Sequence, residues 1–279
     1  MSAEHERGPV DPVAHTGRRS QVARYGWWQL RDYLLDRGAP TVIVLTIFGG
    51  LQVAPMIAIL RGMARSGVGA RMLAQYGTTE AAIAATRHEM GTHFVSGFLG
   101  AIITISALFA MQGIVSNDRK QGFFRFLFAK PVSPSRYYGQ AFAIHGVANA
   151  GLVMLLFVVY GRFMDGVVTG AFVAAFVGMW CCYAGMTFLF SASAKFDWLA
   201  LVAVMMVATL AWGRWATSTS PLAKLLYLLP PMHRTDEVYQ AMGQARALPW
   251  HLLGWFAGYG AICYLLALLV LRHRRLAIP

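Results

Sequence analysis

Six long apolar runs constrain this chain more than any other feature of its sequence. They cover residues 41–60, 94–115, 139–161, 167–191, 198–215 and 250–271. A helix needs about 20 apolar residues to cross the hydrocarbon core of a bilayer. With 57% hydrophobic and 13% charged residues, the chain is also too apolar for a soluble protein of 279 residues. The sequence therefore predicts an all-α membrane protein with six transmembrane helices.

The amino-terminal region has a different composition. Residues 1–22 are rich in Gly, Pro, His and charge, which predicts a disordered cytoplasmic tail, and no cleavable signal peptide is expected. From residue 24 to residue 37 the apolar positions share one helical face, and Trp27 stands at its start. This pattern predicts a helix in the membrane interface, with a soluble juxtamembrane helix as the alternative. Residues 23–279 would form one membrane domain.

Basic residues indicate the orientation. Lysine and arginine are concentrated in the amino-terminal tail, in residues 116–140 and at residues 272–275, and six spans bring all three regions to one side of the membrane. The positive-inside rule places that side, and both termini, in the cytoplasm, and the expected location is the plasma membrane. The net charge of +12 lies beside apolar runs, so it predicts contact with anionic lipid and no binding of nucleic acid.

The segment of residues 116–140 carries the most distinctive local pattern. Asn117 and Asp118 can begin a helix, and Pro131 would end it. One side of this helix would be apolar and consists of Phe123, Phe124, Leu127 and Phe128. Two interpretations follow from this pattern: an aromatic helix resting on the inner leaflet, or a docking element for a cytoplasmic partner.

The two longer connections on the predicted outer side also contain helical signals. Residues 78–87 are compatible with a helix, and so are residues 235–247, where Thr235 followed by two acidic residues predicts a helix start. The apolar stretch 222–229 is too short to span, and it predicts a re-entrant helical hairpin before the last span.

Several short motifs in the 116–140 segment resemble one known family. Asp118-Arg119, Gly122, Leu127 and Pro131-Val132-Ser133 resemble the cytoplasmic segment between the second and third spans in permease subunits of type-2 ABC exporters. The order of elements is similar too: an amino-terminal interfacial helix, six spans, an outer hairpin before the last span and an arginine-rich end. The departures from the family pattern are Lys120, Phe123, Phe124, Arg125 and Gln140.

The resemblance implies a function and a set of partners. In that family the segment forms a coupling helix that sits in a groove of a separate ATP-binding subunit. The residues that the resemblance assigns to this contact are Asp118, Arg119, Gly122, Phe123, Phe124, Leu127, Phe128 and Pro131. A second copy or a paralogue would complete the pathway, and the outer hairpin would close its exit. ATP and magnesium would bind to the partner, and the chain, which lacks a phosphate-loop motif, would have no ATPase activity of its own.

Polar residues within the predicted spans are few. Gln52 lies in the first run, and His145 and Asn149 lie four residues apart in the third. Buried polar groups in a membrane normally face protein or water. These three residues are candidates for a translocation path, and hydrogen bonding between packed helices is the alternative.

Other chemistry finds little support in the sequence. His88, Glu89 and His93 lie close together, but the two histidines are five residues apart, whereas a zinc-protease helix needs them four apart. We therefore expect no catalytic residue, no metal site and no cofactor on this chain. Weak metal contact by His88, Met90, Met232 and His233 on the predicted outer face is the alternative. The alternative functions are a six-span assembly factor or lipid-acting enzyme with a lipid-binding basic loop, and a secondary transporter. The inverted repeats and mid-membrane ionisable groups typical of the last class are not evident.

Overall fold

The structure is a computed structural model that describes residues 24–122, 133–163, 169–194, 197–215, 221–243 and 246–273. Within these ranges the regular structure is helical and no strand occurs. Six helices are long and apolar enough to cross a membrane. These findings confirm the predicted helical fold with six candidate spans. The predicted tail, residues 1–22, lies outside the described residues.

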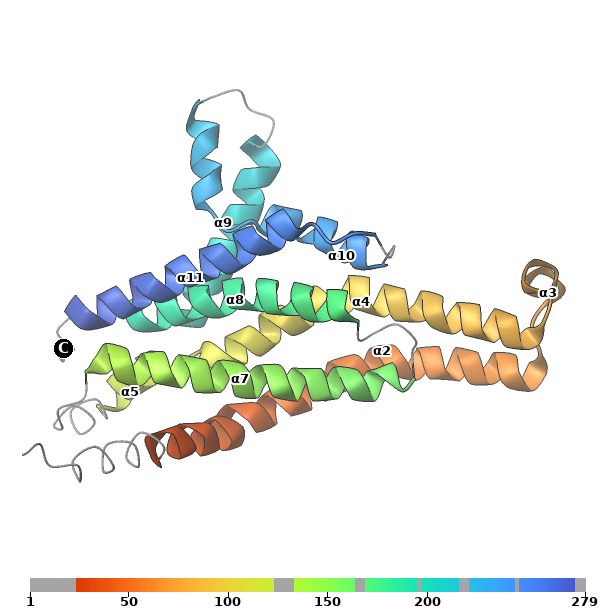
Figure 1. Cartoon of the computed structure of the whole chain (residues 1–279), viewed down its shortest axis with the longest axis horizontal. Coiled ribbons are helices and arrows are strands. Elements are labelled where there is room, and N and C mark those ends of the chain that lie inside the picture. Colours follow the sequence, from red (N-terminus) through yellow and green to blue (C-terminus); the bar gives the residue numbers. More distant parts are fainter. Residues whose placement is uncertain are drawn as a thin grey trace, which may run out of the picture.

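Most of the long helices lie side by side, whereas α9 and η2 rise away from the others (Figure 1). The six long helices are Arg24–Ser66, which ends in α2 (Ala39–Ser66), then α4 (Thr79–Met111), α7 (Pro134–Gly161), α8 (Gly170–Ser193), α9 (Asp197–Trp215) and α11 (Trp250–His273). The short elements are η1 (Leu34–Gly38), α3 (Ala70–Tyr76), α5 (Ser116–Gln121), η2 (Pro221–Leu228), η3 (Met232–Arg234) and α10 (Thr235–Gly243).

The amphipathic stretch 24–37 is not a separate helix. It leads directly into the first span, and Arg24–Ser66 forms one helix of 43 residues. At about 1.5 Å per residue such a helix is roughly 65 Å long, about twice the thickness of the hydrocarbon core. Trp27 and Trp28, 64% and 57% exposed, lie near its beginning. The expected interfacial helix is thus the first part of a longer one.

A proline explains the irregular turn inside this long helix. Pro40 is the second residue of α2, two positions after the last residue of the π-helical turn η1. Proline has no N–H, and its ring clashes with the carbonyl group four residues earlier in an α-helix. The wider turn of a π-helix displaces that carbonyl group, so η1 accommodates Pro40 and the helix continues.

The first two spans extend as a helical hairpin beyond the apolar runs that predicted them. Helix α2 continues to Ser66 and α4 begins at Thr79, with α3 between them. Gly67 and Gly77, both with φ of +76°, make the turns on either side of α3. The Thr78 side chain accepts a hydrogen bond from the Ala81 N–H at 3.1 Å and caps α4. The predicted helix over residues 78–87 is confirmed.

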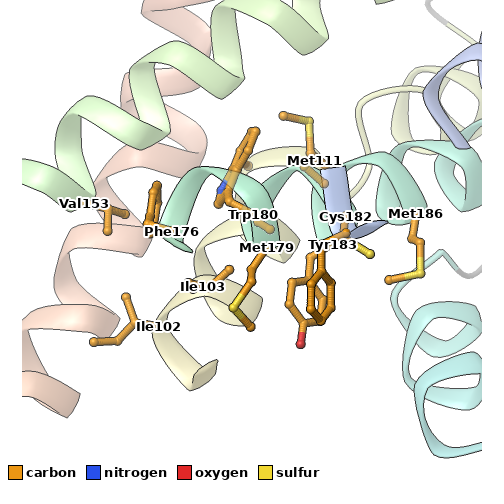
Figure 2. Close-up of a cluster of buried hydrophobic side chains, with 14 of the residues drawn as sticks. Ile102, Ile103, Met111, Val153, Phe176, Met179, Trp180, Cys182, Tyr183 and Met186 are labelled. Atoms are coloured by element: carbon orange, nitrogen blue, oxygen red, sulfur yellow. The ribbon is translucent and has the colours of Figure 1, made fainter. Parts of the chain in front are cut away.

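Helix α8 is the centre of the bundle. Its sequence is apolar on all sides, and its side chains are buried nearly all round, as Figure 2 shows for Phe176, Met179 and Trp180. Its closest neighbour is α11, where Gly185 and Gly260 bring the two backbones together. A Cβ atom on either glycine would collide with the backbone of the other helix.

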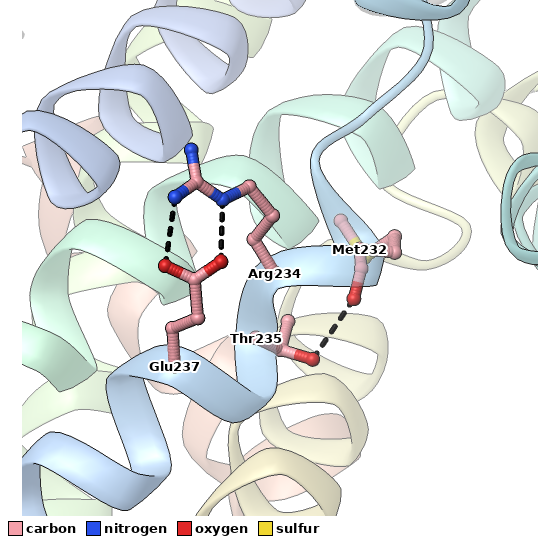
Figure 3. A network of polar contacts seen from close by, with 4 residues as sticks. All are labelled: Met232, Arg234, Thr235 and Glu237. Carbon is pink, nitrogen blue, oxygen red and sulfur yellow. Dashed lines mark hydrogen bonds and ion pairs between the residues drawn. The ribbon is translucent and has the colours of Figure 1, made fainter. Parts of the chain in front are cut away.

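The connection before α11 is folded into short helices, and the predicted re-entrant hairpin stays a prediction. Residues Pro221–Leu228 form the 3₁₀-helix η2, and Leu225, Tyr227 and Leu228 are exposed. Helix α10 begins at Thr235, as predicted. The Thr235 hydroxyl donates to the Met232 carbonyl at 2.9 Å (Figure 3). Helix α10 then packs against α4.

Two contacts fix the first turn of α10 and its position on α4. Arg234 donates to both carboxylate oxygens of Glu237 at 2.6 and 2.7 Å (Figure 3). This pair is largely exposed, so it contributes little to stability, whereas it shapes the turn locally. The Tyr239 side chain fills the space beside Gly100 of α4, where any side chain would collide with it. The connection between α9 and α11 is therefore seated on α4.

Candidate functional site

The predicted coupling residues fall partly within the described chain. Asp118, Arg119 and Gly122 are described, and they lie in and just after α5. Five further residues of that prediction lie outside the described residues: Phe123, Phe124, Leu127, Phe128 and Pro131. The site can therefore be built from the base of the segment, where the chain leaves α4 and enters α5.

The carboxyl end of α4 is capped by an arginine from the first helix. Arg37 donates through Nη1 to the carbonyl oxygens of Ala110 and Gln112, at 3.1 and 2.5 Å. The last carbonyl groups of a helix have no partner within the helix and carry partial negative charge, so a cation there is favourable. Arg37 thereby ties the beginning of the Arg24–Ser66 helix to the end of α4.

The turn after α4 has its N–H groups bound from the opposite side. Asp197, the first residue of α9, accepts through Oδ2 from the Gly113 N–H at 2.6 Å and from the Ser116 hydroxyl at 3.0 Å. Ser191 of α8 accepts from the N–H groups of Val115 and Ser116, at 3.1 and 3.3 Å. Both side chains are buried, Asp197 with only 3% of its surface exposed. The two oxygens satisfy donors that would otherwise be buried without partners.

Helix α5 is held by the helices on both sides of it. The Tyr138 hydroxyl, in the first turns of α7, donates to Asp118 Oδ2 at 3.0 Å. Arg119 donates through Nη1 to the Ala192 carbonyl at the end of α8, at 3.1 Å. Gly122 ends α5 with a left-handed φ of +72°, a conformation that glycine adopts without strain. We refer to Arg37, residues 110–119, Ser191 and Asp197 as the joint.

The joint gathers a buried carboxylate and two cations at the point where four long helices meet. Arg37 comes from the first helix, residues 110–119 from α4 and α5, Ser191 from α8 and Asp197 from α9. Most of its hydrogen bonds hold backbone groups, and the Ser116 hydroxyl and Asp118 add bonds between side chains, so its role is mechanical: it fixes the base of the 116–140 segment to the long helices. Low polarity around buried bonds strengthens such contacts.

The candidate path residues His145 and Asn149 occupy an interface between helices. The Asn149 amide donates to the Tyr33 hydroxyl at 3.0 Å and accepts from the Trp180 indole N–H at 2.9 Å. His145 Nδ1 lies 3.3 Å from the Ala110 carbonyl. These bonds join the first helix, α4, α7 and α8, which is the arrangement expected of helix packing. Gln52 lies elsewhere, half-buried on α2. A role of the three residues in translocation stays a prediction.

The histidine motif near the start of α4 faces solvent. His93 Nε2 lies 3.9 Å from Glu89 Oε1, and both side chains are largely exposed. Within the described ranges, no group of three or more His, Cys, Asp or Glu residues is placed to hold a metal ion. His233, on the connection before α11, stacks its ring on Trp212.

Sequence reasoning missed three residues of the joint: Arg37, Ser191 and Asp197. Each stands at the end of an apolar run, where a polar residue is ordinarily assigned to the interface. Asp197 carried the clearest signal, because it is an acidic residue directly before the run 198–215 on the predicted basic side. Its partner in the turn at 113–116 is 81 to 84 residues away in the chain, and no spacing rule connects them.

Comparison with known proteins adds no relative. No family model matches the chain, and no curated protein or solved structure matches it. The resemblance to type-2 ABC permeases therefore rests on the motifs between Asp118 and Ser133 and on the order of the elements.

Proposed function

We propose that this chain is the membrane subunit of an ATP-driven exporter of the type-2 ABC class. It would work with a separate ATP-binding subunit on its cytoplasmic face and with a second copy or paralogue in the membrane. Both termini and the 116–140 segment would lie in the cytoplasm. The proposal combines the sequence resemblance with six helices of spanning length.

The observation that carries the proposal is the joint. A protein driven from outside the membrane needs a segment whose displacement reaches the spans, and only contacts that differ between two states can shift their populations. Bonds from Arg37, Ser191 and Asp197 hold the base of the 116–140 segment to the first helix, α8 and α9. Tyr138 adds α7 through Asp118. A partner that moves the tip of this segment would therefore exert force on the first helix, α7, α8 and α9 together.

Docking of the ATPase is tested by removing the apolar side of the predicted coupling helix. Phe124→Glu combined with Leu127→Glu should leave membrane insertion intact and abolish co-purification with an ATPase expressed from the neighbouring reading frame. Two buried charges in an apolar socket are expected to weaken binding by at least about 3 kcal/mol, more than a hundredfold in affinity.

The matched control places the same charges in η2, which stands away from the bundle and from α5 (Figure 1). Leu225→Glu combined with Leu228→Glu alters two exposed residues of η2 and should leave co-purification unchanged. Normal co-purification and normal stimulated hydrolysis with the 124/127 variant would refute the docking role. Loss of binding in both double variants would show a general defect and count against a specific socket.

A further inference from the structure

Helix α9 contacts the rest of the protein along one face, which runs from Asp197 to Trp212. At its beginning Asp197 and Leu201 are buried, and towards its end Ala208, Ala211 and Trp212 are buried. Between these ends Met205 packs against the core, whereas Val202, Met206 and Val207, which point away from the contacting face, are each about half exposed or more. Figure 1 shows α9 standing away from the other long helices, beside η2. A stiff helix held at two ends carries displacement from one end to the other.

The first of these ends belongs to the joint. The Asp197 carboxylate binds the turn that opens the 116–140 segment, through the Gly113 N–H and the Ser116 hydroxyl. Its other oxygen accepts from the Trp198 N–H at 3.0 Å, within the first turn of α9. One side chain therefore binds both the turn and the helix. Any movement of the turn must either move the start of α9 or break these bonds.

The second end belongs to an aromatic cluster of Trp212, Tyr227, His233 and Trp255. Trp212 stacks on His233 with ring centroids 3.5 Å apart and meets Tyr227 edge-on at 5.5 Å. Tyr227 and His233 each contact Trp255 of α11. The cluster thus joins the end of α9 to η2 and η3, which precede α10. Through α10 the same connection is seated on α4 beside Gly100.

We propose that α9 is a mechanical link between the base of the 116–140 segment and the outer connection of residues 221–243, with Asp197 as its inner attachment and Trp212 as its outer one. The physical warrant is a continuous chain of contacts through one rigid element. The role of this link in export rests on the function proposed above. In an exporter, it would let a movement at the cytoplasmic face alter the outer connection. The contacts that make up this link all lie within the one chain, so the link can be tested without an ATPase.

The link is tested by loosening its inner attachment and observing its outer one. Full-length protein in lipid nanodiscs is compared by amide hydrogen exchange as wild type, Asp197→Ala and Tyr138→Phe. Asp197→Ala should speed exchange in peptides covering residues 113–122 and also in peptides covering residues 226–238, roughly threefold to tenfold in each. Backbone N–H groups in residues 226–238 donate to carbonyl groups of the same connection. The Leu229 N–H donates to the Leu226 carbonyl at 2.9 Å, and the Met232 N–H donates to the Pro230 carbonyl at 2.8 Å.

Tyr138→Phe is the matched control, because it removes a bond of the same joint that does not involve α9. It should speed exchange near α5 and leave residues 226–238 at the wild-type rate. Asp197→Asn keeps one side-chain oxygen as an acceptor and should restore much of the protection at both places. Unchanged exchange at 226–238 in Asp197→Ala, or an equal increase there in Tyr138→Phe, would overturn the link.

A reverse perturbation keeps the proposal testable where Asp197→Ala does not yield folded protein. Coupling between two sites is reciprocal, so Trp212→Leu should speed exchange of residues 113–122 by a similar factor. Wild-type exchange in that peptide would overturn the link. No ATPase is present in either measurement, so failure of the docking experiment and failure of the link are separate results.

Discussion

At the scale of single residues, Asn149 shows how one polar side chain organises several spans. Its amide bonds Tyr33 of the first helix and Trp180 of α8, and the residue itself is fully buried in α7. Each of its partners is an aromatic side chain whose polar atom would otherwise be buried in an apolar interior. Asn149 therefore sets the register of three helices.

Replacing Asn149 tests whether this role is structural. Asn149→Leu leaves the Tyr33 hydroxyl and the Trp180 indole N–H without partners, so the free energy of unfolding should fall by about 1–3 kcal/mol. Thermal unfolding in mild detergent measures the change. Thr209→Val is the control, because the Thr209 hydroxyl is exposed and bonds only the Met205 carbonyl of its own helix. Unchanged stability in Asn149→Leu together with reduced transport would favour the translocation path instead.

At the scale of elements, the pair α8 and α11 depends on two glycines. Gly185 and Gly260 lie where the backbones approach, and a Cβ atom on Gly260 would collide with the Cys181 carbonyl. Close approach increases van der Waals contact, which drives helix association in lipid because apolar side chains there gain nothing from leaving water. Small residues at this crossing thus stabilise the most central contact of the bundle.

Two glycines of α11 provide a matched comparison. Gly260→Ala should force α8 and α11 apart and lower the free energy of unfolding by about 1–3 kcal/mol. Gly258→Ala should leave it unchanged or raise it by up to about 1 kcal/mol through helix propensity, because nothing lies within 4 Å of the added Cβ. Thermal melts of the two variants in the same detergent decide the matter. Equal melting temperatures would show that the crossing tolerates separation.

At the scale of the whole molecule, the joint and the described ends of the chain lie together. Figure 1 places α5, the start of the first helix and the end of α11 at one end of the molecule, and the α3 hairpin at the opposite end. The basic side predicted from the sequence is the side that holds the joint.

Labelling of single cysteines tests the orientation. In a variant with Cys181, Cys182 and Cys263 replaced by alanine, Gln75→Cys in α3 should react with a membrane-impermeant maleimide on intact cells. Ser133→Cys, exposed beside the start of α7, should react only after permeabilisation, because the positive-inside rule places that end in the cytoplasm. The opposite pattern would invert the topology and remove the site for a cytoplasmic partner.

Much of the architecture was predictable because the length of an apolar run can be read directly from neighbouring residues in the sequence. The six apolar runs identified the six long helices, and Thr78 and Thr235 marked helix starts that the structure confirms. The continuous Arg24–Ser66 helix was not predicted, because Gly38 and Pro40 normally interrupt a helix, and only the π-turn η1 accommodates them. The re-entrant hairpin stays a prediction: the structure gives a 3₁₀-helix over residues 221–228, in which Leu225, Tyr227 and Leu228 are exposed and Leu226 is buried.

The sequence alone determined that the chain is helical, how many helices can cross a membrane and which connection carries the family-like motif, because each of these depends on neighbours in the chain. Only the tertiary structure decided which polar residues meet. Asp197 reaches Gly113, Arg37 reaches Ala110, and Asn149 joins Tyr33 to Trp180. Such pairs depend on how helices cross, and a buried donor binds whichever acceptor packing brings within about 3 Å.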